Sequence, residues 1–152
     1  MTSSDKPKSI IVDLDGTLCD CAHRRPFLQE DRPDWRSFNE SMRTDGLNTW
    51  CLELINAMRD SGYKILLVSG RGDDFRDHTI DWLTQYSVAY DVLLMRRAGD
   101  SRKDALVKFD IYKTSIEPLY NVRFVVDDRK QVVEMWRTKL GLVCLQCDEG
   151  DY

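Results

Sequence analysis

Short apolar runs that stop abruptly at polar residues are the main pattern in this chain. Ile10-Ile11-Val12 is followed at once by Asp13, and the run from Lys64 to Val68 ends in Ser69-Gly70. Runs without alternation that end in polar residues or glycine are typical of strands buried on both faces of a parallel sheet. The pattern predicts strands at residues 10–12, 64–68, 92–95, 122–126 and 142–147.

Between these runs, apolar residues recur at helical spacing. Leu47, Trp50, Leu54, Ile55 and Met58 fall on one helical face, and Gly62 closes that segment. Further helices are predicted at about residues 75–86, 102–113 and 132–136. Strands that alternate with helices predict a three-layer, Rossmann-like α/β domain with right-handed crossovers and a mostly parallel central sheet.

The chain length predicts one domain over residues 1–152, because two separate cores would each be near the lower limit for independent folding. Residues 1–8 are expected to be a flexible lead-in. Residues 18–46 form an irregular, polar insertion after the first strand, and an insertion of this length in a compact domain usually has a function.

Composition narrows the class of protein. The chain has no apolar run near the ~20 residues of a membrane span and no apolar segment at its start, which predicts a soluble cytoplasmic protein without membrane contact. The net charge of -4 argues against a broad basic face for nucleic acid, although a small local site stays possible.

The cysteines are odd in number and unevenly spaced, which argues against a disulfide framework. Zinc bound by Cys19, Cys21, Cys144 and Cys147 with His23 is an alternative with unusual spacing, whereas buried or incidental thiols are the ordinary interpretation.

The strand ends carry the candidate chemistry. Asp13 and Asp15 follow the first strand, Ser69 and Arg71 the second, and Asp127-Asp128 the fourth. Ligands of parallel sheets bind beyond the carboxyl ends of the strands, so these side chains are expected to meet. Carboxylates converging in a cleft require a divalent cation, and an all-oxygen site of this kind suits Mg2+ with a phosphate-bearing substrate.

Such a site supports phosphoryl transfer. One carboxylate can attack phosphorus to give an aspartyl-phosphate, and a second, two residues on, can serve as general acid and then base. Lys108 would stabilise the transferring phosphoryl group, and Asp104, four residues earlier on the same helical face, would orient it. Gly16 is expected to expose backbone N–H groups to an anion, and Thr17 and Ser69 add hydroxyls. Each feature alone could be a turn or a surface charge; their order along the chain argues against that.

This order resembles the haloacid dehalogenase (HAD) superfamily of phosphohydrolases, which carries Asp-x-Asp-Gly-Thr, a Ser or Thr, a Lys and a late acidic pair. Longer segments resemble the 3'-phosphatase domain of phage polynucleotide kinase-phosphatase. They are Val68 to Arg71, Gly99 to Asp104, Asp127 to Arg137 and the closing Gly150-Asp151-Tyr152, and the resemblance covers roughly Ser9 to Tyr152.

The resemblance implies a role for each matched residue. Asp13 would be the nucleophile and Asp15 the general acid/base, while Asp13, Asp127, Asp128 and the Asp15 carbonyl would hold Mg2+. The residues implied at the phosphate and substrate are Thr17, Arg24, Ser69, Gly70, Arg71, Asp104 and Lys108.

The chain also departs from that family. It has no G-x-x-x-x-G-K-[ST] phosphate loop, so a complete protein of this length would lack the 5'-kinase activity. The insertion matches poorly beyond Arg24. Such an insertion normally forms a cap, in which Phe27, Trp35 and Phe38 either make a small core or stack on a nucleobase.

The predicted activity is therefore Mg2+-dependent removal of 3'-phosphates from DNA or RNA ends, in the host cytoplasm if the gene is carried by a phage. A small-molecule nucleotidase of the same superfamily is the main alternative, and a phosphoacceptor signalling domain is a remote one. The sequence leaves four properties open. They are the preference for DNA or RNA, the preference for single-stranded or duplex ends, activity on 2'- or cyclic phosphates, and the oligomeric state.

Overall fold

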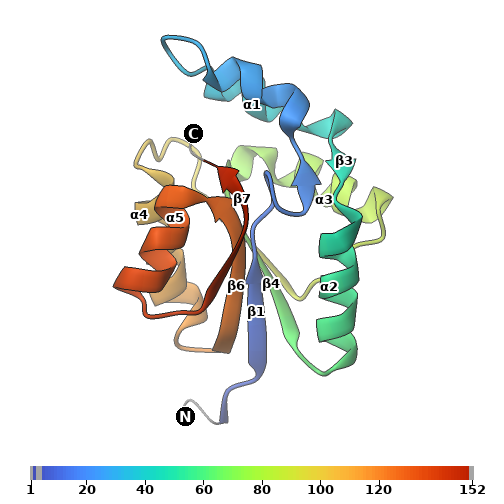
Figure 1. The fold of residues 1–152 in the computed structure, drawn as a ribbon, viewed down its shortest axis with the longest axis vertical. Helices are drawn as coiled ribbons and strands as arrows, with labels where there is room; N and C mark the ends of the chain where they lie inside the picture. The colour runs from blue at the N-terminus through green and yellow to red at the C-terminus, as the bar shows by residue number, and fades with distance from the viewer. Residues whose placement is uncertain (1, 3–4, 151–152) are drawn as a thin grey trace.

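A five-stranded parallel sheet forms the centre of the molecule (Figure 1). The computed structural model describes Thr2 and residues 5–150. The strand order is β5-β4-β1-β6-β7, so the first strand lies in the middle. The strands are β1 (Lys8–Val12), β4 (Lys64–Gly72), β5 (Val92–Arg96), β6 (Asn121–Arg129) and β7 (Cys144–Gly150). The predicted α/β class and parallel sheet are confirmed.

Helices cover both faces of the sheet, which gives three layers (Figure 1). One face packs against α2 (Thr49–Asp60) and α3 (Arg76–Gln85), and the other against α4 (Asp104–Ile111) and α5 (Lys130–Glu134). Single π-helical segments, Tyr112–Ile116 and Met135–Lys139, continue α4 and α5. Along β1, Ile10 and Val12 enter one core while Ile11 enters the other, because side chains alternate along a strand. In the described part of the chain, no helix is both long enough and apolar enough to cross a bilayer.

The insertion after β1 folds into a small cap over the carboxyl edge of the sheet (Figure 1). A two-stranded antiparallel pair closes its base, with Cys19 beside Leu47 and Asp20 beside Gly46. The cap contains β2 (Cys19–Asp20), a 3-10 segment (Ala22–Leu28), α1 (Trp35–Glu40), a 3-10 turn (Met42–Thr44) and β3 (Gly46–Leu47). Asp34 begins α1 as its N-cap, since its side chain accepts the N–H of Ser37. The predicted cap insertion is confirmed.

Several details differ from the sequence predictions. Leu47 lies in β3 rather than on α2, and β7 begins at Cys144 rather than at residue 142. Lys8 belongs to β1, whereas the sequence analysis placed it in the lead-in. Trp50 is 43% exposed rather than buried, because the core face of α2 is centred on Cys51 and Ile55, one turn apart. Of the predicted lead-in and closing segments, residues 1, 3–4 and 151–152 lie outside the described part of the chain.

The α2 face supplies a direct test of the core. Ile55→Ala should lower the free energy of unfolding by about 2–5 kcal/mol, because this fully buried side chain packs against the sheet. Leu106→Ala, at a position 54% exposed on α4, is the control and should change stability by less than about 0.5 kcal/mol. Urea denaturation followed by circular dichroism measures both, and equal effects would contradict the assigned core face.

Candidate active site

Three neighbouring strands deliver polar side chains to the same edge of the sheet. In the parallel register, Val12 of β1 lies beside Leu67 of β4 and Val126 of β6. The residues that follow these positions emerge together, as expected at the carboxyl ends of parallel strands. They are Asp13 and Asp15 after β1, Ser69, Gly70 and Arg71 in β4, and Asp127 and Asp128 in β6.

Asp13, Asp127 and Asp128 form a buried group of carboxylates. One oxygen from each lies within 4.8 Å of the others, and none of the three residues is more than 6% exposed. Burial raises the pKa of Asp13 well above its usual range, and Asp127 raises it further, against the opposing charge of Lys108. A cation relieves such crowding of like charges, and an all-oxygen donor set suits a hard divalent ion. The group therefore fits a divalent metal.

Lys108 brings a positive charge into this group from α4. Its Nζ lies 2.8 Å from Asp13 Oδ1 and 3.1 Å from Asp127 Oδ2, and the side chain is buried. Asp104, one turn earlier on α4, places a third carboxylate oxygen at 3.6 Å. Burial alone would lower the pKa of Lys108, but the carboxylates of Asp104, Asp127 and Asp13 hold it well above its usual range. The lysine is therefore charged at neutral pH.

Two buried arginines hold the carboxylate of Asp15. Arg71 Nη2 and Arg24 Nη2 donate to Asp15 Oδ1 at 2.6 and 2.5 Å, and Arg71 Nε donates to Oδ2 at 3.1 Å. Burial alone would raise the pKa of Asp15, but the charges of Arg71 and Arg24 outweigh it and hold that pKa well below its usual range. Asp13 and Asp15 are two residues apart, yet their surroundings shift their pKa values in opposite directions.

Asp45, which the sequence analysis did not identify, holds both arginines from the end of the cap. Its carboxylate accepts from Arg24 Nε and Nη2 at 2.8 and 2.5 Å and lies 3.6 Å from Arg71 Nη2. Its backbone carbonyl accepts Trp82 Nε1–H at 3.0 Å and the Tyr86 hydroxyl at 3.3 Å, which ties the cap to α3. No local pattern marks this residue, because its partners are distant in the sequence.

The turn after β1 uses its own backbone donors. The N–H of Gly16 donates to Cys19 O at 2.9 Å and the N–H of Thr17 to Leu14 O at 3.0 Å. Both N–H groups are hydrogen-bonded within the turn. The expectation that Gly16 exposes them to an anion is therefore wrong. Thr17 Oγ1 instead donates to Asp13 Oδ2 at 3.0 Å and so orients that carboxylate.

Two glycines permit close approach of acidic side chains. Gly16 has φ +83°, and a Cβ there would overlap Asp128 Oδ2. A Cβ on Gly70 would overlap Asp104 Oδ1. A side chain at either position would displace one of these carboxylates, and at Gly16 it would also strain the backbone.

A cavity of about 460 Å³ opens between this edge of the sheet and the cap. Of the predicted site residues, those that line it are Asp13, Asp15, Gly70, Arg71, Asp104, Lys108 and Asp128. The other predicted site residues are buried, at most 1% exposed, and do not line the cavity: Thr17, Arg24, Ser69 and Asp127. The structure thus brings all the predicted residues together but places only part of them where a ligand can touch them. Of the cap aromatics, both Phe38 and Trp35 line the cavity, Phe38 buried and Trp35 42% exposed, whereas Phe27 is half-buried and does not line it.

All five cysteines are free thiols. Burial raises the pKa of Cys21 and Cys144 to about 12 and that of Cys147 to about 11, which keeps them protonated at neutral pH. A second group of potential ligands, Asp15, Cys19 and Asp45, surrounds the guanidinium groups of Arg24 and Arg71 rather than open space. These thiols therefore pack as small apolar side chains.

Comparison with known proteins identifies relatives over nearly the whole chain. Residues 7–152 match the family model of the polynucleotide kinase PNKP phosphatase domain. A protein of Autographa californica nuclear polyhedrosis virus, named as a candidate bifunctional polynucleotide kinase/RNA ligase, is 31% identical over 135 residues, which are 86% of this chain and 18% of that protein.

Solved structures also include chains that are similar to this one. A chain in the Pnkp1/Rnl/Hen1 RNA repair complex superposes with a TM-score of 0.87 at 38% identity, over 98% of this chain and 45% of that one. The class C acid phosphatase from Bacillus anthracis shares the fold, with a TM-score of 0.64 at 15% identity over 84% of this chain and 54% of that one. This chain therefore spans less than half of the viral protein and of the RNA repair protein. The family match, the shared fold and the acidic site together show that the chain belongs to the HAD-superfamily phosphatase domains of polynucleotide kinase-phosphatase.

Proposed function

We propose that this chain is a Mg2+-dependent polynucleotide 3'-phosphatase that removes 3'-phosphates from DNA or RNA ends and so prepares them for repair. The observation that carries the proposal is the meeting of Asp13, Asp15, Lys108 and the acidic pair at one cavity in a chain of this family. The RNA repair complex that contains a 38% identical chain supports a role in end healing. We propose residues 1–152 as one phosphatase domain.

Asp13, Asp127, Asp128 and the backbone carbonyl of Asp15 would hold Mg2+. When bound, the ion neutralises the carboxylates and the oxygens of the substrate phosphate, which favours attack on phosphorus. The donor chemistry fits, because the three carboxylates approach one another within 4.8 Å and supply only oxygen.

In the first step, the Asp13 carboxylate attacks phosphorus, the bond between phosphorus and the 3'-oxygen breaks, and an aspartyl-phosphate forms. Asp15 is ionised in the free chain, so it takes up a proton as substrate binds, from the phosphate monoanion or from solvent, and gives that proton to the departing 3'-oxygen. Thr17 and Lys108 each contact one oxygen of Asp13 and hold the carboxylate in position. Lys108 also stabilises the negative charge on the transferring group.

In the second step, Asp15 takes a proton from water, and the water oxygen attacks the aspartyl-phosphate to release inorganic phosphate and restore Asp13. The two arginines suit this step, because they keep Asp15 ionised and aimed at the cavity. Ser69, Gly70 and Arg71 form the β4 side of the phosphate site, and Asp104 orients Lys108. We assign Arg24 to the orientation of Asp15, since it is fully buried.

Loss of the nucleophile should abolish turnover. Asp13→Asn should lower kcat on a 3'-phosphorylated oligonucleotide by at least about 10³-fold, because the amide cannot attack phosphorus. EDTA should abolish wild-type activity and added Mg2+ should restore it. Phosphate release measures both, and Asp60→Asn, at an exposed position at the end of α2, is the control. Full activity of Asp13→Asn or of the metal-free enzyme would refute the mechanism.

Substrate length separates the proposed function from a small-molecule nucleotidase. We expect a higher kcat/KM for 3'-phosphorylated DNA or RNA oligonucleotides than for a nucleoside 3'-monophosphate at equal Mg2+. Steady-state kinetics on these three substrates measure the preference. A preference for the mononucleotide would favour the nucleotidase instead.

The contacts of Asp45 predict a leaving-group effect. Asp45→Asn leaves Arg24 and Arg71 without their shared carboxylate, so Asp15 should lose its orientation and kcat on the oligonucleotide should fall by about 10²-fold. 4-Nitrophenyl phosphate, whose leaving group needs no proton, should lose less. Because this change also breaks a buried ion pair, urea denaturation must first show that the variant is folded under the assay conditions. An equal loss on both substrates would show that Asp45 does not act through the acid role of Asp15 in the first step.

A further inference from the structure

The cavity is larger than the phosphate chemistry requires. At about 460 Å³ it falls within the size range of small-molecule sites, and it extends from Asp13 and Lys108 upward between the cap and the loop before α4. Part of its lining consists of residues to which the proposed mechanism gives no role. They include Trp35, Asn39, Ser101, Arg102, Lys103 and Arg129.

Trp35 is presented to this space and is not part of the core. It is the first residue of α1 and 42% exposed, although it lines the cavity. The buried Phe38 supports it from below through an edge-to-face contact, with ring centroids 5.6 Å apart and planes at 82°. Phe38 in turn lies against Arg24, at 4.3 Å from guanidinium carbon to ring centroid. The indole thus packs, through Phe38, against the arginine that holds Asp15.

Trp35 also contacts the residue that follows the acidic pair in the sequence. The guanidinium of Arg129, the residue directly after Asp128, lies 5.3 Å from the indole centroid. Asn39, one helical turn after Trp35, lines the same cavity. Its amide offers a donor and an acceptor, which suit the edge of a nucleobase.

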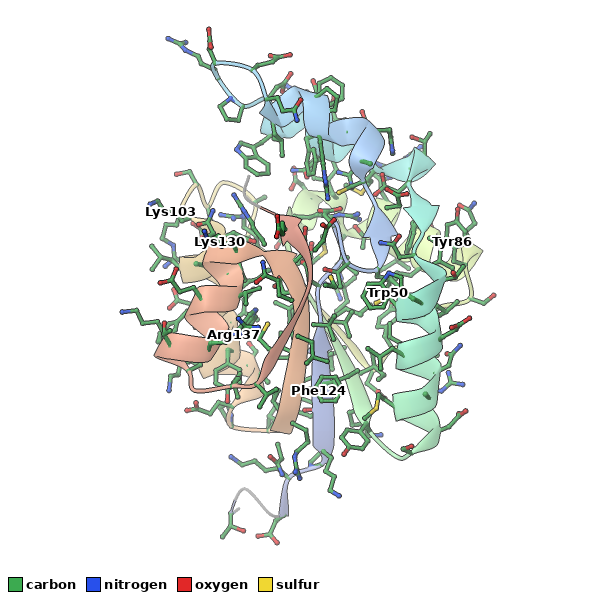
Figure 2. The ribbon with its side chains drawn as sticks, viewed as in Figure 1. Trp50, Tyr86, Lys103, Phe124, Lys130 and Arg137 are labelled. Carbon is green, nitrogen blue, oxygen red and sulfur yellow. The ribbon has the colours of Figure 1, made fainter. Side chains whose placement is uncertain are left out.

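The loop before α4 and the start of that helix also line the cavity, where the cations Arg96, Arg102 and Lys103 outnumber the carboxylates Asp100 and Asp104. Arg96 donates to the carbonyls of Asp100 and Arg102 at 2.9 and 2.6 Å, and so holds the loop before α4 in shape. Lys103 lines the cavity at the N-cap position of α4. Figure 2 shows Lys103 on the α4 side of the sheet and Trp50, the other exposed tryptophan, on the α2 side.

We propose that Trp35, Asn39 and Lys103 form a subsite for the terminal nucleoside of the substrate. The base stacks on the exposed part of the Trp35 ring, Asn39 meets the base edge, and Lys103 contacts the preceding phosphodiester. This inference rests on the proposed function and adds to it. The enzyme selects a phosphate carried by a base-bearing nucleotide, and one stacking contact accepts any base because every base has a π-face.

The test compares two oligonucleotides that differ only at the 3'-phosphorylated terminal residue, which carries either a base or an abasic tetrahydrofuran. Trp35→Ala should lower kcat/KM for the base-bearing end by about ten-fold, mainly through KM, and should leave the abasic end unchanged. Trp35→Phe should keep most of the selectivity. Trp50→Ala, which removes a tryptophan of similar exposure from α2, should behave as wild type.

Equal losses on both ends with Trp35→Ala, or no loss on either, would overturn the subsite. If wild type hydrolyses neither oligonucleotide, the proposed function fails instead, and binding decides the subsite. Adenosine 3'-monophosphate should then quench tryptophan fluorescence of wild type but not of Trp35→Phe. Quenching that is equal in the two proteins, or absent from both, would overturn the subsite in that case.

Discussion

The burial of several carboxylates at one edge of the sheet is the constraint on which the rest of the structure depends. Asp13, Asp45, Asp104, Asp127 and Asp128 are each at most 7% exposed. A buried charge costs several kcal/mol unless a partner compensates it. The chain compensates with three cations that are equally buried, Lys108, Arg24 and Arg71. Each comes from a different element: Lys108 from α4, Arg24 from the cap and Arg71 from β4. The site therefore needs the cap, the sheet and α4 folded together.

These charges fall into two groups with different chemical consequences. Around Asp13, carboxylates outnumber the single lysine, so burial and the neighbouring negative charges raise the pKa of Asp13. The excess of carboxylates also favours the binding of a further cation. Around Asp15, two arginines dominate, so its pKa is depressed. Two carboxylates separated by one residue thus receive opposite surroundings, the arrangement by which enzymes give similar groups different roles. Residues i and i+2 of a strand point to the same side, but Asp13 and Asp15 lie beyond the end of β1, where the chain turns, and so they can have different surroundings.

The sequence predicted features that depend on local pattern or on strand order. The parallel sheet follows from short apolar runs, and the meeting of Asp13, Ser69 and Asp127 follows from the rule for strand ends. The Asp104–Lys108 contact follows from helical spacing. Asp45 could not be predicted in this way, because its partners lie 21 residues away at Arg24 and across the fold at Arg71.

Errors in the sequence analysis have the same origin. Trp50 matches the apolar spacing of α2 as well as Cys51 does, and only packing against the sheet decides which of them is buried. The fate of the Gly16 and Thr17 N–H groups likewise depends on how tightly the turn closes. Pattern alone specifies which residues lie on a helix or in a turn, whereas tertiary contacts specify the direction in which each group points.

The cations of the site are paired with carboxylates inside the protein, which affects what the net charge of -4 implies for binding of a polyanion. From the sequence, Arg24, Arg71 and Lys108 look like contacts for a polyanion, yet all three are buried and bound to carboxylates. They add little to the long-range attraction of nucleic acid, which depends on exposed positive charge. In the proposed function, contact beyond the terminal phosphate would fall instead to a few residues that line the cavity, such as Lys103 and Trp35. Stacking is less sensitive to salt than phosphate contacts are, so an acidic protein can hold one strand end without a basic face.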